Sequence, residues 1–551
     1  MDNKVTNNEN MRRYVHMALA KQASQAGGGG LSPEEVEAMI NQALEAYSEA
    51  ELQKAIENDY AILDPGEETY AYGVLIDFTE GKSSPDLIRI GNPELHRTLP
   101  VQSQYKGCIW DYIHKEILYY LNPENWNLAV NDEINNVVKT AEQVAADMAN
   151  LGYGIRVETP KFYARSQVLA TDGAGNTTMA KVMFSTQKLN PFYIEIPRQV
   201  TDFRNARMGD GIMSGGYELL CNMNTEDETM AGGYATAKNT LTGITDEYLY
   251  PITNWDREHA REAAHNANSH LMCYEYYKWL FYWAFVIEYA TLNSHKPVIN
   301  ELDENGFHQG GLGGGLTNFV ENNGISLTDT TGKDKCRYIG VTNELGNGTG
   351  ELNIPTDTNL DKVGHPNRYR GFECPFGDIY LVLDGFLGIP VENQDGDVVF
   401  YDYYSCCNPE YFADEIPLPF DVDNDYSTAV SRQWTKIARY EDLNTSDLYV
   451  SDEGEGLAMG YITKYMSVGN RGEMMPQMWE NEQENYFVNY SYVRDKASSD
   501  KALLDVGSYA RNVDALYVGL GRFDANYVLS DANHSLGFRC FNIIQDDGTV
   551  I

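Results

Sequence analysis

The sequence lacks any apolar stretch long enough to serve as a secretory leader or as a membrane-spanning helix. Its longest strongly apolar run, residues 279–287, lies between Lys278 and Glu288. That run is far shorter than the roughly 20 residues that a helix needs to cross a bilayer. The N-terminal residues are polar and include neither an apolar segment nor a small-residue cleavage site. We therefore expect a chain that is made and folded in a cytoplasm without membrane insertion.

Cysteine is also scarce, with 8 residues in 551. None of them forms a CxxC pair or shows the His spacing of a zinc site, so no metal site is predicted from them. Cys406 and Cys407 are adjacent, which is a poor geometry for a mutual disulfide. The sequence predicts mostly buried free thiols, with one of this adjacent pair packed inward.

Basic residues are few relative to acidic ones. The chain has 41 Lys and Arg against 81 Asp and Glu, which gives a net charge of −40. Such a chain repels nucleic acid and anionic lipid, and it gains solubility. We expect neither nucleic acid nor a membrane as a partner.

Motifs of catalysis and cofactor binding are missing. The histidines are dispersed, and no HExxH or Gly-x-Ser-x-Gly pattern occurs. The glycine-rich residues 310–315 lack the strand and helix of a phosphate loop and predict a tight surface loop instead. Asp421, Asp423 and Asp425 alternate as in a calcium loop, but Tyr426 and Arg432 replace the Gly and Glu of an EF-hand. A solvated acidic loop and a looser structural calcium site both stay open there, and no enzyme or cofactor is predicted.

An isolated amphipathic helix is predicted near the N-terminus. Four glycines at 27–30 form a hinge, and Ser32, Pro33 and Glu35 then provide a capping box with Pro at the first helical position. An apolar stripe without a nearby partner favours self-association over packing on its own domain. The residues expected at this oligomer interface are Val36, Met39, Ile40, Ala43, Leu44 and Tyr47.

After this stem the pattern changes to short strands and two helices. Alternating runs at residues 70–78, 87–90 and 154–162 predict strands. Residues 131–150 carry apolar side chains at helical spacing and predict an amphipathic helix on a sheet. Residues 269–293 are apolar on nearly every side and predict a core helix. The fold class expected is α+β, with an N-terminal helical stem before a mixed α/β domain.

Tyrosine is abundant, with 39 residues, about double ordinary usage. Many of these tyrosines stand beside Asn, Asp, Ser or Gly, a composition typical of binding loops. In such loops rigid amphipathic rings give contact area at low entropic cost. About half are expected to cover a thin core. The others are candidates for stacking on sugar rings or for contacting protein.

The C-terminal segment Gly537-Phe538-Arg539-Cys540 resembles the closing motif of the formylglycine-generating-enzyme-like branch of C-type-lectin folds. Residues 89–92, 95–100, 160–163, 287–294, 310–318, 345–350 and 370–377 resemble stretches of virion proteins of Bacteroidales phages, including crAss-like ones. The likeness extends over most of the chain beyond the stem. It departs in one respect, because the oxidising enzymes of the fold use two cysteines five positions apart and this chain has no such pair. Their catalytic activity is therefore not implied.

The resemblance implies a receptor-binding head or tail fibre protein of a phage, located in the virion and binding a host surface glycan or protein. Residues 1–30 would attach to a capsid or tail protein, 31–62 would form the stem of a homotrimer, 63–260 a mixed α/β domain and 261–551 a C-type-lectin-like domain. The alternatives are a polysaccharide-cleaving spike and a purely structural decoration or collar subunit.

In this family the ligand surface lies on the solvent face beside the last strand. Gly519 and residues 536–540 would fix that scaffold, while the residues between them alternate aromatic and short polar types. The residues predicted to bind ligand are Tyr486, Asn489, Tyr490, Tyr492, Arg494, Asp495, Arg522, Asp524, Asn526, Tyr527 and Asn533.

We predict that the full-length chain is an oligomer, with three copies favoured, because the stem stripe would otherwise stay in contact with water. Light scattering should give a multiple of the chain mass for the full-length protein and a lower mass for a shortened chain that begins at Tyr60. Finding a monomer in both cases would remove the stem hypothesis.

Overall fold

The computed structural model describes residues 63–78, 86–148, 153–171, 177–206, 255–315, 342–352, 354–355, 363–416, 433–441, 457–467, 471–480, 490–494, 500–506, 519–532 and 536–551. The predicted attachment segment, the stem and its six interface residues lie outside these ranges, as do Asp421, Asp423 and Asp425. Strands hold 41% of the described residues and helices 18%. The mixed class is confirmed, with strands as the larger share.

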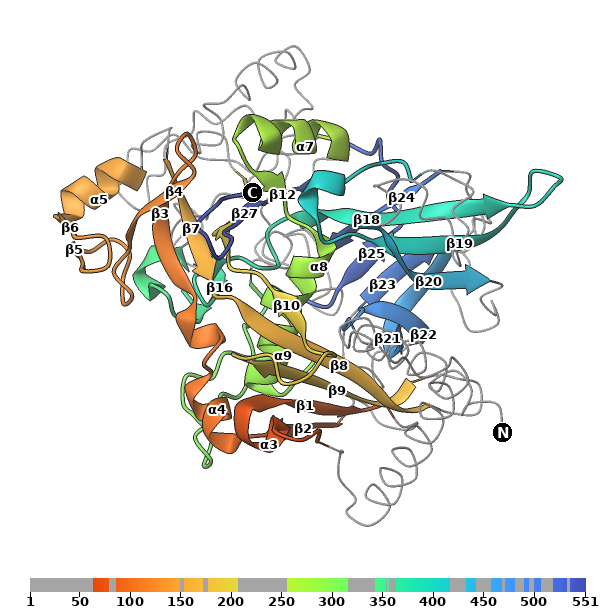
Figure 1. Ribbon diagram of the computed structural model, residues 1–551, viewed down its shortest axis with the longest axis horizontal. Coiled ribbons are helices and arrows are strands. Elements are labelled where there is room, and N and C mark those ends of the chain that lie inside the picture. The colour runs from red at the N-terminus through yellow and green to blue at the C-terminus, as the bar shows by residue number, and fades with distance from the viewer. Residues whose placement is uncertain are drawn as a thin grey trace, which may run out of the picture.

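An antiparallel five-stranded sheet is built from the first part of the described chain (Figure 1). Tyr72, Val74 and Ile76 alternate along its central region and point into the main core, as a strand with one buried face requires. The predicted strands at 70–78 and 87–90 are confirmed here. In spatial order the strands are β10 (Ile194–Ile196), β8 (Phe162–Thr171), β9 (Thr177–Ser185), β1 (Ala71–Asp77) and β2 (Asp86–Gly91).

A six-stranded sheet joins distant parts of the sequence. Its centre pairs β11 with both β7 and β27, so residues near 200 lie between residues near 157 and residues near 542. The order is β12 (His270–Leu271), β27 (Cys540–Ile543), β11 (Gln199–Asp202), β7 (Tyr153–Thr159), β3 (Lys106–Asp111) and β4 (Glu116–Tyr120). All of these pairs are antiparallel.

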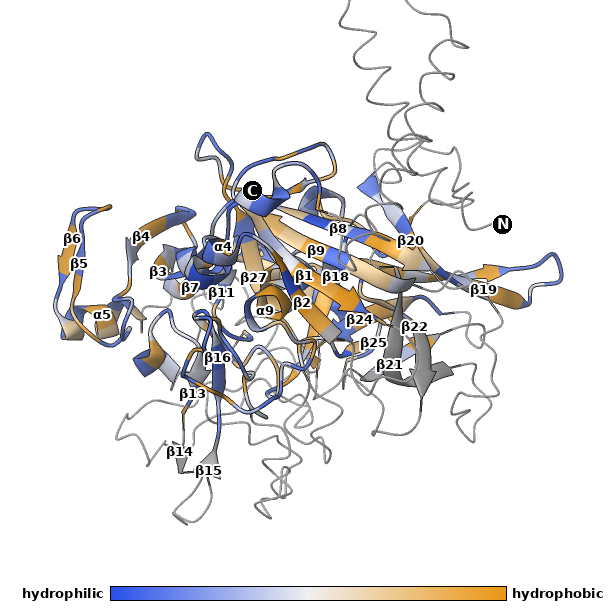
Figure 2. Ribbon diagram, turned by 90° about the horizontal axis from the view of Figure 1, so that it is seen from below, coloured by the Kyte–Doolittle hydropathy of each residue, from blue (hydrophilic) through white to orange (hydrophobic). Residues whose placement is uncertain are grey.

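A nine-stranded sheet is formed by the C-terminal half of the chain. Its order is β20 (Thr435–Glu441), β19 (Val398–Ser405), β18 (Tyr380–Glu392), β24 (Ala502–Val506), β25 (Phe523–Ala525), β23 (Tyr490–Arg494), β21 (Leu457–Ser467) and β22 (Met475–Glu480). The ninth strand, β26 (Leu536–Gly537), pairs in parallel with the start of β18. In Figure 2 the apolar strands β9, β18 and β24 gather in the middle of the molecule.

Short elements complete the described chain. The small sheets are β13 (Gly350–Glu351), β16 (Asn367–Tyr369) and β17 (Phe372–Glu373), then β14 (Ile354–Pro355) with β15 (Val363–Gly364), and β5 (Val130–Asp132) with β6 (Val137–Lys139). The helices are α3 (Glu67–Tyr70), α4 (Pro93–Thr98), α5 (Ala141–Met148), α7 (Arg257–Asn266), α8 (Tyr274–Tyr277) and α9 (Ala284–Tyr289). Single 3₁₀ turns span Gln102–Gln104, Thr342–Leu345 and Pro409–Tyr411. Among the described residues no helix is long and apolar enough to cross a membrane.

A buried helix connects the five- and nine-stranded sheets. The helix α8 contacts β18, and α9 contacts β1 (Figure 1). Between them Lys278–Trp283 is a π-helical segment, and every side chain from Tyr274 to Trp283 is buried. The core helix predicted within 269–293 is confirmed, although it is shorter. It ends where Ala290 takes the left-handed conformation, and its expected start is instead β12.

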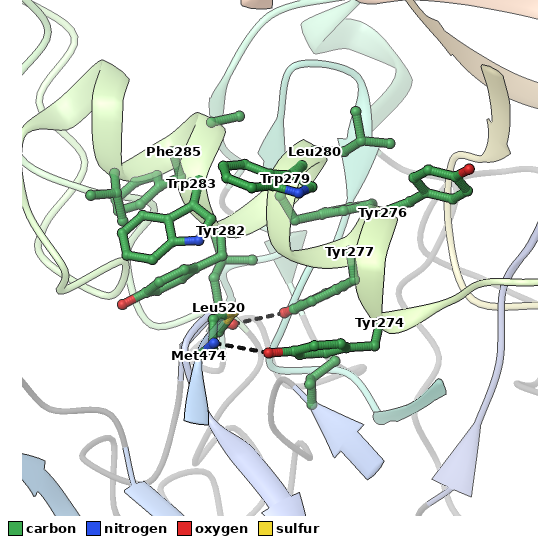
Figure 3. Close-up of a cluster of buried hydrophobic side chains, with 14 of the residues drawn as sticks. Tyr274, Tyr276, Tyr277, Trp279, Leu280, Tyr282, Trp283, Phe285, Met474 and Leu520 are labelled. Carbon is green, nitrogen blue, oxygen red and sulfur yellow. Dashed lines mark hydrogen bonds between the residues drawn. The ribbon is translucent and has the colours of Figure 1, made fainter. Parts of the chain in front are cut away.

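The buried helix places large rings against distant loops. Trp283 Nε1 donates to the carbonyl of Gly472 at 2.7 Å, and the Tyr277 hydroxyl donates to the carbonyl of Leu520 at 2.9 Å. The Tyr274 hydroxyl accepts from the Met474 amide at 2.8 Å, as Figure 3 shows together with the Tyr277 bond. A side chain at Gly472 would meet the ring of Trp279 at 2.6 Å. The aromatic helix therefore fixes the positions of loops that are remote in sequence.

One predicted helix is partly wrong. Only the second half of 131–150 is helical, as α5, and the first half is the β5–β6 hairpin. The Asp132 carboxylate accepts from the amides of Ile134 and Asn135, and Asn136 adopts a positive φ, which turns the chain. Ile134 is 67% exposed, so the apolar residues counted as a buried stripe lie partly at the surface. The hairpin and α5 lie at the periphery of the molecule (Figures 1 and 2).

The glycine-rich loop at 310–315 is a loop as predicted, but it is largely buried. Leu312 has no exposed surface. A side chain at Gly310 would meet the carbonyl of Pro297 at 2.5 Å, and one at Gly311 would meet the carbonyl of Lys296 at 2.7 Å. The glycines permit a close approach of two backbone segments beneath the surface.

The expected domain boundary at residue 260 does not separate two cores. One cluster of buried apolar side chains runs from Tyr72 to Phe541, and β11 pairs with β27 across the boundary. The described residues on both sides therefore share a hydrophobic core.

Trp283→Ala should lower the free energy of unfolding by about 3 to 5 kcal/mol, as truncation of a fully buried large aromatic does. Tyr70→Ala is a suitable control, because Tyr70 is 53% exposed and such changes alter stability by less than about 0.5 kcal/mol. Denaturant unfolding monitored by circular dichroism measures both. Equal midpoints for Trp283→Ala and the wild type would contradict the placement of this helix in the core.

Candidate ligand-binding face

The nine-stranded sheet has one face in the main core and another turned away from it. Leu504 and Phe523 belong to the main core cluster. Because side chains alternate along a strand, Asp505 and Asp524 point to the opposite side. We call this side of β18, β24, β25 and β23 the outer face (Figure 1).

The strand register aligns four side chains in a row across the outer face. Val382 of β18 pairs with Asp505 of β24, Asp505 pairs with Asp524 of β25, and Asp524 pairs with Tyr492 of β23. Directly paired residues have neighbouring side chains on the same face. The row therefore places an aromatic ring beside two carboxylates.

Arg522 joins the two carboxylates. Its Nη1 lies 2.5 Å from Asp505 Oδ1, and its Nη2 lies 2.7 Å from Asp524 Oδ2. The guanidinium carbon lies 4.0 Å from the ring centroid of Tyr380, within the range of a cation–π contact. All three charged side chains are buried, with exposed fractions of 0 to 5%. One guanidinium thus orders two strands and a tyrosine.

Arg522 bonds to both carboxyl groups of this group. Burial raises the pKa of Asp505 well above its ordinary value, and the neighbouring Asp524 adds to this rise. Burial would lower the pKa of Arg522, but the attraction of Asp505 outweighs it and raises that pKa. Asp505 Oδ2 has no hydrogen-bond partner. The raised pKa and the unbonded Oδ2 favour the protonated form of Asp505.

Tyrosines surround this buried group and reach the surface. Tyr380, Tyr492 and Tyr527 are all half-buried. Tyr380 and Tyr527 pack on the cluster of Val382, Leu503 and Leu536. The carbonyl of Tyr527 accepts from the Leu503 amide at 3.0 Å, which ties the segment after β25 to the sheet. The rings are therefore held on a rigid base with part of each surface in contact with water.

The residues predicted to bind ligand fall into three groups. Tyr492, Asn526 and Tyr527 are half-buried on or beside the outer face, which suits contact with a ligand. Arg522 and Asp524 are buried, so the expectation of exposed loop residues is wrong for both. Tyr490 and Arg494 belong to β23, whereas Tyr486, Asn489, Asp495 and Asn533 lie outside the described residues.

Two residues of the face were missed by the sequence reasoning. Tyr380 begins β18, far from the C-terminal loops in sequence, and the pairing of β18 with β24 and β26 brings it near. Asp505 had a detectable signal, because it is the single charged residue in the apolar run 502–506. A carboxylate in such a run is expected to have a partner, since burial of an unpaired charge is costly.

The arrangement suits noncovalent recognition. Both carboxylates are bonded to the same guanidinium, and Asp505 has no exposed surface, so this pair orders the face. The half-exposed phenol rings and the Asn526 amide can offer stacking area and hydrogen bonds to a ligand. In the described part of the chain no group of three or more His, Cys, Asp or Glu side chains is arranged to hold a metal ion.

A scan against protein-family models and a search of the curated proteins found no match to this chain. The chemistry of the outer face therefore has to be argued from its own residues.

Asp505→Asn should change how stability depends on pH. The folded-state pKa of Asp505 is raised, so its stabilising contribution is fully present below its unfolded pKa and is lost as pH rises through the folded value. Asparagine stays neutral at every pH. The melting temperature of the wild type should therefore fall relative to Asp505→Asn as the pH rises above about 4, the ordinary pKa of an aspartate.

The matched control is Asp395→Asn, in the exposed turn between β18 and β19. Its melting curve against pH should run parallel to that of the wild type. A parallel curve for Asp505→Asn as well would show that Asp505 does not bind a proton on folding.

Proposed function

We propose that this chain is a structural, receptor-binding protein of a bacteriophage particle, a head or tail fibre subunit, and that its outer face binds a host surface glycan. The observation that carries the proposal is the set of half-buried tyrosines, Tyr380, Tyr492 and Tyr527, held on a sheet by a buried ionic group. The resemblance of several segments to phage virion proteins supports the proposal that the chain is part of a phage particle.

Stacking is the main source of binding energy in this proposal. The face of a sugar ring that carries C–H groups is apolar, and a phenol ring is large, rigid and amphipathic. The Tyr527 carbonyl is hydrogen-bonded to the Leu503 amide, and the Tyr527 side chain packs on the apolar cluster beneath it. Because the ring is already held in place, little side-chain entropy is lost when a ligand covers its exposed part. Asn526 lies beside Tyr527, and its amide group would add hydrogen bonds to ring hydroxyls.

The wider assembly belongs to the same proposal. Residues 1–30 would attach to a capsid or tail protein, 31–62 would join three copies, and the sheets beyond them, which share one core, would include the C-type-lectin-like fold. Each face would bind weakly, and three copies on one particle would raise the avidity. The net charge of −40 agrees with a surface held in water and with the absence of nucleic acid among its partners.

The double variant Tyr492→Ala, Tyr527→Ala should lose most binding of the purified protein to host cells. Loss of about 1.4 kcal/mol at each ring would weaken the affinity of one face by about a hundredfold. Tyr70→Ala is the control, because it removes an exposed ring from α3, outside the nine-stranded sheet, and should bind like the wild type. Cell-binding assays on all three proteins, with melting temperatures recorded in parallel, measure the effect.

Undiminished binding by the folded double variant would move the site away from the outer face. The same samples should be incubated with host polysaccharide and assayed for new reducing ends. Their appearance would replace the binding proposal with a cleaving spike.

A further inference from the structure

A buried ionic cluster lies where the described chain begins. Because Ala164, Ala180 and Val182 of β8 and β9 point into the main core, Arg165 and Lys181 lie on the other face of the five-stranded sheet. There they meet Asp64 and Glu67, which precede and begin α3. Lys181 and Glu67 have no exposed surface, and Asp64 and Arg165 have very little.

Each oxygen of Asp64 has a different environment. Oδ2 accepts from Asn190 Nδ2 at 3.0 Å and from Arg165 Nη1. Oδ1 lies 3.9 Å from Lys181 Nζ. Two donors therefore bind Oδ2, while Oδ1 lies nearer the Lys181 amine. This is the arrangement that stabilises an oxyanion during attack on a carboxyl carbon.

Glu67 is positioned to carry protons between the same groups. Its Oε2 lies 2.7 Å from Lys181 Nζ and accepts from the Asp64 amide at 2.8 Å. Its Oε1 accepts from the Tyr193 hydroxyl and from Arg165, each at 3.0 Å. Burial raises the pKa of Glu67, which suits a group that takes up and releases a proton.

We propose that Lys181 and Asp64 condense to an intramolecular amide, with Glu67 as the proton carrier and with Arg165 and Asn190 as the oxyanion donors. Lys181 Nζ gives a proton to Glu67 and attacks Asp64 Cγ, and the electron pair moves to Oδ2. The bond from Cγ to Oδ1 then breaks, and Oδ1 leaves as water with two protons from the ammonium group. One C–N bond forms, one C–O bond breaks, and no oxidant is required.

Burial favours the amide over the ion pair. Charges removed from water are costly, and the attraction of a buried pair repays this cost only in part. Condensation replaces one ammonium and one carboxylate by a neutral group and leaves the Arg165–Glu67 pair intact at 3.0 Å. The cluster is thus electrically balanced before and after the reaction.

A second Lys–Asp pair lacks these features and provides an internal comparison. Lys139 Nζ lies 2.6 Å from Asp147 Oδ2, closer than Lys181 lies to Asp64. However, Lys139 is 31% exposed and Asp147 is 17% exposed, so water solvates the charged forms. Asp147 Oδ2 accepts from Lys139 Nζ and from the Tyr119 hydroxyl. We expect this pair to stay ionic.

The amide would link Asp64 covalently to Lys181. It would therefore attach the start of the described chain, which follows residues 1–62, to β9. The amide between Asp64 and Lys181 is independent of the proposed ligand and of the outer face. As a covalent bond it would survive denaturation, whereas an ion pair between the same two residues would not.

Peptide mapping of the denatured full-length protein tests the proposal. A cross-linked peptide containing Asp64 and Lys181 should appear, with a mass lower by one water than the sum of its two parts. It should be absent from Lys181→Met, retained in Lys139→Met, and reduced at least tenfold in Glu67→Gln.

Recovery of the two peptides only as separate, unmodified species from the wild type would overturn the proposal. So would a water loss that maps to an Asp-Gly sequence such as Asp395-Gly396, where ring closure removes the same mass within one peptide. An unchanged yield in Glu67→Gln would overturn the role of Glu67. The wild-type measurement needs no variant to fold, so an unstable variant leaves the main result intact.

Discussion

The fold depends on one buried guanidinium at the junction of two sheets. Arg539 follows β26 of the nine-stranded sheet and precedes β27 of the six-stranded sheet, and it is almost fully buried. Its nitrogens donate to the carbonyls of Phe203, Glu373 and Cys374 and to Asn205 Oδ1. Burial lowers its pKa to about 10, so it keeps its charge at neutral pH. The rigid fork of donors connects β17 and the segment after β11 to this junction, and a lysine could not reproduce it.

Buried charged side chains also occur elsewhere in the core, where they form pairs of opposite charge. These pairs bear on the charge of the surface. Arg156 pairs with Asp202 at 2.9 Å in the six-stranded sheet, and Lys278 lies 3.0 Å from Glu275 in the buried helix. Each such pair removes one basic and one acidic residue from contact with water. Because acidic residues outnumber basic ones by 81 to 41, removing matched pairs makes the remaining surface more acidic than the composition suggests. Burial of matched pairs leaves the net charge at −40, so the whole acidic excess remains outside these pairs.

Helices and strands that depend on local sequence patterns were predictable, whereas contacts between residues far apart in the sequence were not. The core helix and the strands near 71–77 and 153–159 follow from apolar periodicity. The apolar spacing in the hairpin at 130–139 fits 3.6 residues and so predicts a helix, while Asp132 and Asn136 carry the turn signal. Tyr492 and Tyr527 were predicted from tyrosine usage, but no local pattern could show that Arg522 points inward to Asp505. Burial of a charged residue depends on a partner that only the strand pairing supplies.

The outer face separates the residues that hold it from those that can touch a ligand. Asp505, Arg522 and Asp524 are buried and bonded to one another, so replacing Arg522 would leave two carboxyl groups facing each other and would disturb the strands. Tyr492 and Tyr527 keep part of their surface in water. Under the proposed function, substitution of these tyrosines would alter the surface that is offered to a ligand while the sheet stays in register. A surface that must follow a changing host receptor would benefit from this division.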